Sequence, residues 1–151
     1  MVASYNNVIY FVAKRFRMNP KFQNTLAVIA GIVIGSSINM TIVLKGHLLI
    51  AMPEGADVTT EAGLKASLHL FQPKHFIMPF LAHALGTLGG SLVVAKMAAT
   101  NPFRYAMAIG VAFMLGGIIN AFTLPGPVWF DIVDILGAYL PMSYLALKLA
   151  K

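Results

Sequence analysis

The chain contains no cysteine. Disulfides, thiolate metal sites and thiol chemistry are therefore excluded, including the quinone-linked disulfide chemistry of some small membrane proteins. Acidic residues are also scarce: Asp and Glu number five among 151 residues, and charged residues of both signs make up only 11% of the chain. Because a soluble domain carries about 25% charged residues, this composition argues against a water-soluble globule.

Long apolar runs take the place of charge, since 58% of the residues are hydrophobic. A helix needs about 20 apolar residues to cross a bilayer, and four runs of that length follow one another along the chain. The sequence therefore predicts an all-α fold, a single integral membrane domain in the lipid bilayer built as a four-helix transmembrane bundle. We expect the spans at residues 24–44, 76–98, 104–123 and 128–149, with residues 45–75 as the one long loop.

Two segments outside the spans carry helical patterns. Before the first span, apolar residues on one face from Val8 to Phe16 accompany three cations, which is typical either of a helix lying on the membrane surface or of a flexible basic leader. In the loop, Thr59 or Thr60 can cap a short helix that runs to about Phe71. The pattern places Leu64, Leu68 and Phe71 towards the bundle and Lys65, Ser67 and His69 towards water.

The net charge of +6 is distributed unevenly. It forms no basic face with interleaved aromatic residues, so we expect no nucleic-acid partner. Most of the cations instead flank one side of the predicted spans, and the positive-inside rule then places both termini in the cytoplasm and the long loop outside. The cations on the cytoplasmic side are Lys14, Arg15, Arg17, Lys21, Lys96, Arg104, Lys148 and Lys151.

Each predicted span carries at least one polar residue at a similar depth, within roughly the outer 5–10 Å at 1.5 Å per residue. This polar layer comprises Asn39, His83, Asn120, Asp131 and Asp134. In the simplest interpretation the layer is structural: His83 pairs with Asp131 or Asp134, and the asparagines bridge helices.

The alternative interpretation makes the polar layer an outward-facing site for a proton, an ion or a small solute, because ionisable residues inside a membrane are typical of proton relays and coupling sites. A path from this layer towards the cytoplasm would have to follow the hydroxyls of Ser36, Ser37, Thr87 and Ser91.

Metal binding and catalysis have weaker support. No pair of histidines has the spacing that places two ligands on one helical face, and no G-x-S-x-G nucleophile elbow is present. We therefore expect no metal, no cofactor and no catalytic residues.

Small residues recur at helical spacing on three spans and predict close helix packing. These stripes offer more contact surface than so small a bundle uses internally. The leading hypothesis is therefore a non-enzymatic membrane protein, an accessory subunit of a membrane complex or a homo-oligomer, with proton, ion or small-solute transport as the alternative. The packing residues are Gly31, Gly35, Ala82, Gly86, Gly90, Gly110 and Gly117.

Two motifs resemble a known group. The turn Met52-Pro53-Glu54-Gly55, followed by the A-H-x-x-G span from Ala82 to Gly86, resembles small four-span proteins of the bacterial inner membrane that have no assigned activity. The similarity covers Gly35 to Ala98. It implies a bacterial protein in which the turn and His83 belong to one outward-facing feature, and it implies no particular function.

Overall fold

The computed structural model describes residues 18–124 and 126–151. The segment from Val8 to Phe16, expected to be either a surface helix or a flexible leader, lies outside the described residues. The described part is about 80% helical and contains no strand. Four helical segments in it are long and apolar enough to cross a membrane: Pro20–Leu48, Pro73–Met97, Pro102–Thr123 and Val128–Leu149. The predicted all-α bundle with four candidate spans is confirmed, and the orientation of its termini stays a prediction.

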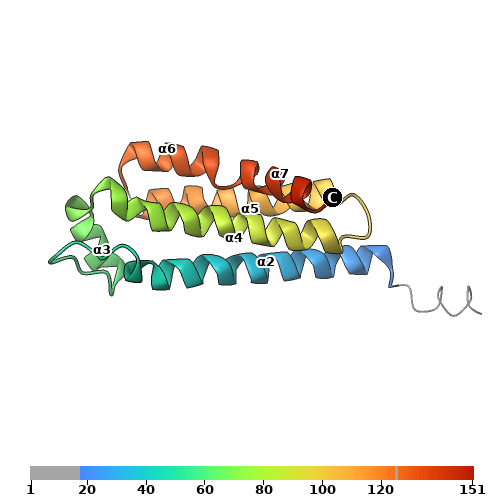
Figure 1. Cartoon of the computed structure of the whole chain (residues 1–151), viewed down its shortest axis with the longest axis horizontal. Coiled ribbons are helices and arrows are strands. Elements are labelled where there is room, and N and C mark those ends of the chain that lie inside the picture. The colour runs from blue at the N-terminus through green and yellow to red at the C-terminus, as the bar shows by residue number, and fades with distance from the viewer. Residues whose placement is uncertain (1–17, 125) are drawn as a thin grey trace, which may run out of the picture.

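Helix α4 (Ile77–Met97) lies at the centre of the bundle (Figure 1). Helix α2 (Pro20–Lys45) packs along one side of it, and α5 (Pro102–Thr123) and α7 (Leu140–Leu149) pack along the other, with α6 (Val128–Gly137) continuing the line of α7. The start of α2 and the end of α7 lie at one end of the bundle, which we call the terminal end. The segment between α2 and α4 lies at the opposite end, the loop end.

The helices begin at residues that favour a start. Asn19 caps α2 because its side-chain oxygen accepts a hydrogen bond from the Lys21 amide at 2.9 Å, and Pro20 occupies the first turn, where a missing N–H costs nothing. Asn101 precedes α5 in the left-handed conformation, with φ of 47°, which asparagine tolerates better than most residues. The two helices therefore start two to four residues earlier than residues 24 and 104.

The fourth span is broken in the middle. Helix α6 ends at Gly137 and α7 begins at Leu140, so the helix is interrupted at Ala138 and Tyr139, just before Pro141. The ring of Pro141 cannot donate to the Gly137 carbonyl and would clash with it in a continuous helix. Ala138 and Tyr139 are nevertheless fully enclosed, with 0% and 2% of their surface exposed.

Glycines bring α2 and α4 into backbone contact. A Cβ atom built on Gly31 would lie 2.7 Å from the Gly90 carbonyl oxygen, and one built on Gly35 would lie 2.7 Å from the Gly86 carbonyl oxygen. Conversely, a Cβ atom built on Gly90 would lie 2.6 Å from the Gly31 carbonyl oxygen, and one built on Gly86 would lie 2.9 Å from the Gly35 carbonyl oxygen. The small-residue stripes of the first two spans thus pack against each other, and Ala82 is fully buried one turn nearer the loop end.

The loop from Gly46 to Phe76 is built from short helical pieces. They are η1 (Gly46–Leu48), α3 (Glu61–Ser67), η2 (Leu68–Leu70) and η3 (Pro73–Phe76). Thr60 caps α3 by accepting from the Gly63 amide at 2.9 Å. The prediction that Ser67 faces water is wrong: its hydroxyl accepts from the Asp57 amide at 2.9 Å, and it is 6% exposed because the chain before α3 folds back over it.

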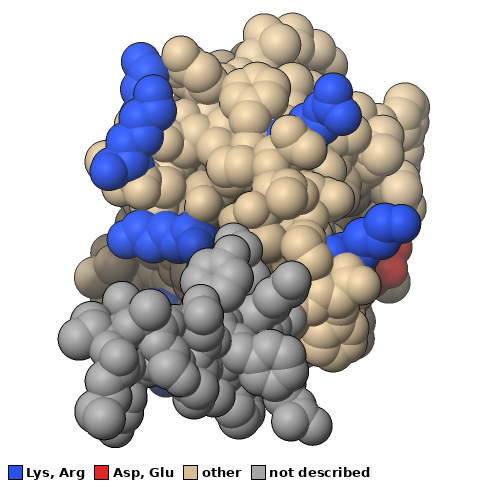
Figure 2. All heavy atoms as spheres, turned by 90° about the vertical axis from the view of Figure 1, so that its right-hand side faces the viewer, with Lys and Arg blue, Asp and Glu red and all other residues tan. Residues whose placement is uncertain are grey.

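Charge separates along the bundle. Figure 2 looks onto the terminal end and shows lysine and arginine side chains standing around its margin. The described cations at this end are Lys21, Lys96, Arg104, Lys148 and Lys151. The acidic residues all lie in the loop or in α6, and large apolar side chains are exposed on the sides of the helices. Four apolar helices with such surfaces fit an integral membrane protein.

Candidate functional site

A cavity of about 900 Å³ lies at the loop end, between α2, α4, α5 and α6. The loop from Gly46 to Phe76 also lines it, and we call this segment the covering loop. The five residues of the predicted polar layer all line it. Helix α2 contributes Asn39, α4 contributes His83, α5 contributes Asn120, and α6 contributes Asp131 and Asp134. Residues far apart in the sequence thus line one cavity.

Asp134 is the most deeply buried member of the layer, with 4% of its surface exposed. The Nδ1 atom of His83 lies 2.9 and 2.8 Å from its two carboxylate oxygens, which suits an N–H donated to the carboxylate. The hydroxyl of Tyr139 donates to the same carboxylate at 2.8 Å. The rings of His83 and Tyr139 stack with their centroids 5.7 Å apart. Of the two partners expected for His83, the structure selects Asp134.

Tyr139 reaches Asp134 because the fourth span breaks beside it. Its ring packs against Gly117 of α5, where an added Cβ atom would lie 3.0 Å from the tyrosine Cε2 atom. Gly117 therefore makes room for the Tyr139 ring rather than for a neighbouring backbone. Sequence reasoning missed Tyr139; the available signal was a hydroxyl-bearing aromatic residue at the middle of a span, two residues before a proline.

Asp131 and the two asparagines differ from Asp134. No side chain or backbone group of residues 18–124 and 126–151 hydrogen-bonds the Asp131 carboxylate, which is partly exposed to the cavity. The side chains of Asn39 and Asn120 likewise have no hydrogen-bond partner in that part of the chain, so the expected bridges between helices do not form. These three residues present free polar groups to the cavity.

Hydroxyl groups continue from this site into the bundle. Thr87, one turn from His83 on α4, donates to the His83 carbonyl at 2.7 Å. A turn further, Ser91 lies 2.7 Å from the Ser143 hydroxyl of α7 and 3.2 Å from the Ala106 carbonyl. Thr87, Ser91 and Ser143 are all 0% exposed.

The serines of α2 do not join this column. Ser36 and Ser37 are exposed on the surface of the helix, and Ser37 donates back to the Val33 carbonyl at 2.8 Å. A polar route through the molecule would therefore follow α4 and α7 rather than α2.

One wall of the cavity is aromatic. Phe76 packs against Phe130 with ring centroids 4.9 Å apart, and against Phe71 at 6.1 Å. Trp129 meets Phe76 edge-on at 5.7 Å from outside the cavity. Aliphatic side chains and three methionines from α2, the loop and α4 also line the cavity, the methionines being Met40, Met52 and Met78.

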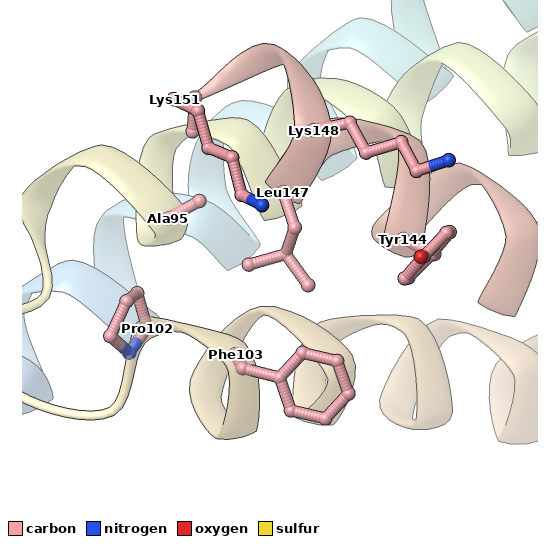
Figure 3. A pocket seen from close by; sticks show the side chains of 8 residues that line it. Ala95, Pro102, Phe103, Tyr144, Leu147, Lys148 and Lys151 are labelled. Atoms are coloured by element: carbon pink, nitrogen blue, oxygen red, sulfur yellow. The ribbon is translucent and has the colours of Figure 1, made fainter.

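A second, smaller cavity of about 310 Å³ lies at the terminal end, between α5 and α7 (Figure 3). Lys148 and Lys151 stand on its α7 side, and Pro102 and Phe103 lie on its α5 side. The Lys148 ammonium group lies 4.9 Å from the centre of the Tyr144 ring. This cavity contains cations and no carboxylate side chain, whereas the loop-end cavity contains two carboxylates.

Fold and site together define a helical membrane protein with a largely apolar cavity, lined also by a group of polar side chains, at one end of its bundle. The chain matches no protein-family model, no curated protein and no solved structure. Within the described residues, no three His, Asp or Glu side chains come together as candidate ligands of a metal ion.

Proposed function

We propose that the protein is a transport protein of the membrane, which binds a proton and a small solute in the loop-end cavity. In this proposal the terminal end lies in the cytoplasm and the cavity opens on the opposite side. The Asp134–His83 pair is the group that gains and loses the proton.

One observation carries the proposal. Four helices place polar side chains around a single cavity, and the most buried of these, Asp134, is held between His83 and Tyr139. A carboxyl group and an imidazole in direct contact among membrane-spanning helices are groups that proton-coupled membrane proteins use. The column of buried hydroxyls at Thr87, Ser91 and Ser143 supports a polar route beyond the pair.

The competing proposal, an accessory subunit or homo-oligomer, rested on surplus small-residue stripes. Gly31 and Gly35 instead pack against Gly90 and Gly86 of the same chain. Gly110 and Gly117 likewise pack against Ser143 and Tyr139 of the same chain. The stripes therefore no longer favour an external partner, and association with other subunits stays a prediction without a specific contact surface.

The test is flux in liposomes that contain the purified protein, a pH-sensitive dye and a clamped membrane potential. After a pH jump, the wild-type protein is expected to change the internal pH faster than empty liposomes. Asp134→Asn is expected to reduce this flux at least tenfold, because an amide cannot carry the proton.

The matched control is Glu61→Gln, the same chemical change at an exposed residue of α3. It should retain the wild-type flux. Thermal unfolding in detergent must show that both variants remain folded. Equal flux from the wild type, Asp134→Asn and empty liposomes would refute the proposal.

A further inference from the structure

The geometry points to an amphipathic organic cation, a quaternary ammonium or phosphonium group on an aromatic or aliphatic body, as the solute of the loop-end cavity. This inference rests on the proposed function, because it names the class of solute that the same cavity takes. Asp131 is the residue that recognises the positive charge.

The charged residues that line the cavity favour a solute with a positive charge. Asp131 and Asp134 are the formally charged residues of the cavity, and no lysine or arginine of the described chain lines it. Three histidines also line it, but the Nδ1 atom of His75 accepts from the Gln72 amide at 2.8 Å and so carries no proton. His47 is exposed at the rim, and His83 is engaged with Asp134.

The two carboxylates have different surroundings. Asp134 already receives hydrogen bonds from His83 and Tyr139, so its carboxylate oxygens have partners within the protein. Asp131 has no such partner among the described residues and lies one helical turn nearer the covering loop. A carboxylate that lines a partly enclosed, largely apolar cavity without a counter-charge attracts a cation more strongly than it would in bulk water, because the effective dielectric constant is lower.

The remaining lining selects an organic cation. The rings of Phe71, Phe76 and Phe130 form one wall, and aromatic faces attract cations that have lost part of their water shell. Methionines around the same space adapt to irregular apolar groups. A volume of about 900 Å³ lies within the range of sites for drug-sized molecules and far exceeds what a single inorganic ion fills.

The test compares two ions of the same size and opposite charge, tetraphenylphosphonium and tetraphenylborate. Binding to the full-length protein in detergent is measured by equilibrium dialysis, with empty micelles subtracted. We expect saturable binding of the phosphonium ion, and no competition from the borate ion. Asp131→Asn should weaken phosphonium binding roughly tenfold, the loss of one partly desolvated charge interaction.

Two further variants keep the test decisive. Asp131→Glu retains the charge and should bind within a few-fold of the wild type. Ala121→Lys places a competing ammonium group on a lining residue of α5 and should abolish phosphonium binding. Thermal unfolding in the same detergent verifies that each variant is folded.

The inference is overturned by no saturable phosphonium binding, by equal binding of the two ions, or by wild-type affinity in folded Asp131→Asn. Displacement by short-chain phosphatidylcholine but not by benzyltrimethylammonium would assign the site to a lipid headgroup, and would also overturn it. The two proposals can be refuted separately. If the flux depends on Asp134 but the phosphonium ion does not bind, only the inferred class of solute is refuted. If the phosphonium ion binds but that flux is absent, the proposed transport function is refuted.

Discussion

At the scale of single residues, the site depends on one carboxylate with two partners. Asp134 is almost fully enclosed, and a buried carboxylate is tolerated only when its oxygens are hydrogen-bonded. His83 and Tyr139 meet this requirement from two different elements, α4 and the break in the fourth span. The His83 contact therefore also fastens the fourth span to α4 at the centre of the bundle, and the Tyr139 contact joins the two sides of the break within that span.

Removing the tyrosine hydroxyl tests this contribution. Tyr139→Phe should lower the free energy of unfolding by about 1–3 kcal/mol, because Asp134 loses one of its two partners without regaining water. The measurement is unfolding in detergent followed by circular dichroism. Tyr144→Phe is the control, since Tyr144 is 51% exposed and keeps its ring beside Lys148. If the two variants lose the same stability, the Tyr139 hydroxyl contributes nothing.

At the scale of the elements, close packing of α2 on α4 depends on four glycines whose backbones touch. Gly90→Ala should destabilise the protein by about 1–3 kcal/mol, since the new methyl group meets the Gly31 carbonyl, which belongs to a rigid helix backbone. Gly116→Ala is the same change at an exposed position of α5 where nothing lies within 4 Å. It should be neutral or stabilising by up to about 1 kcal/mol, because alanine favours helix. Thermal unfolding of both variants in detergent distinguishes these outcomes, and equal midpoints would contradict the packing argument.

The spans themselves were predictable because their signal is local. Apolar length, prolines at helix starts and the Thr60 cap depend on neighbouring residues, so the helices appear near the expected positions. The partners of the glycines were not predictable in the same way. The G-x-x-x-G spacing indicates that a backbone approaches, but which backbone approaches is decided by the tertiary arrangement of α2 and α4.

The candidate site likewise has features that the sequence predicts and features that only the structure shows. Similar depths in four spans indicated the group of five polar residues, because depth follows from counting along a helix. Counting along a helix does not show how far each helix is rotated about its axis, and it does not show the break at Tyr139. The choice of Asp134 over Asp131 as the partner of His83, and the role of Tyr139, required the packed structure.

At the scale of the whole molecule, two acidic residues of the covering loop accept hydrogen bonds from neighbouring residues of the same loop. The amide and hydroxyl of Thr59 both donate to Asp57, at 2.9 and 2.6 Å, and hold the pKa of that carboxyl below its ordinary value of 3.8. The hydrogen bond from Lys65 likewise lowers the pKa of Glu61 below 4.5. Both groups lie outside the predicted membrane spans.

Because both pKa values are lowered by folding, the two carboxylates contribute stability that is present at neutral pH and is lost as the pH falls through the lowered values. We expect amide protection factors in residues 56–67 to decline below about pH 4, while those of α4 remain unchanged. Hydrogen exchange at several pH values, corrected for intrinsic rates, provides the measurement. In Asp57→Asn the amide oxygen can still accept both bonds without titrating, so the decline should be smaller. An identical decline in that variant would exclude Asp57 as its source.

The contact between Trp129 and Phe76 has an optical consequence. Trp129 is the sole tryptophan of the chain, and it stands on α6 beside the aromatic wall of the cavity. Its indole is therefore the one strongly fluorescent group, and any displacement of α6 relative to Phe76 changes the polarity and quenching that it experiences. The protein thus carries an intrinsic reporter at the wall of its cavity, and its emission spectrum can be followed in real time without attaching a label.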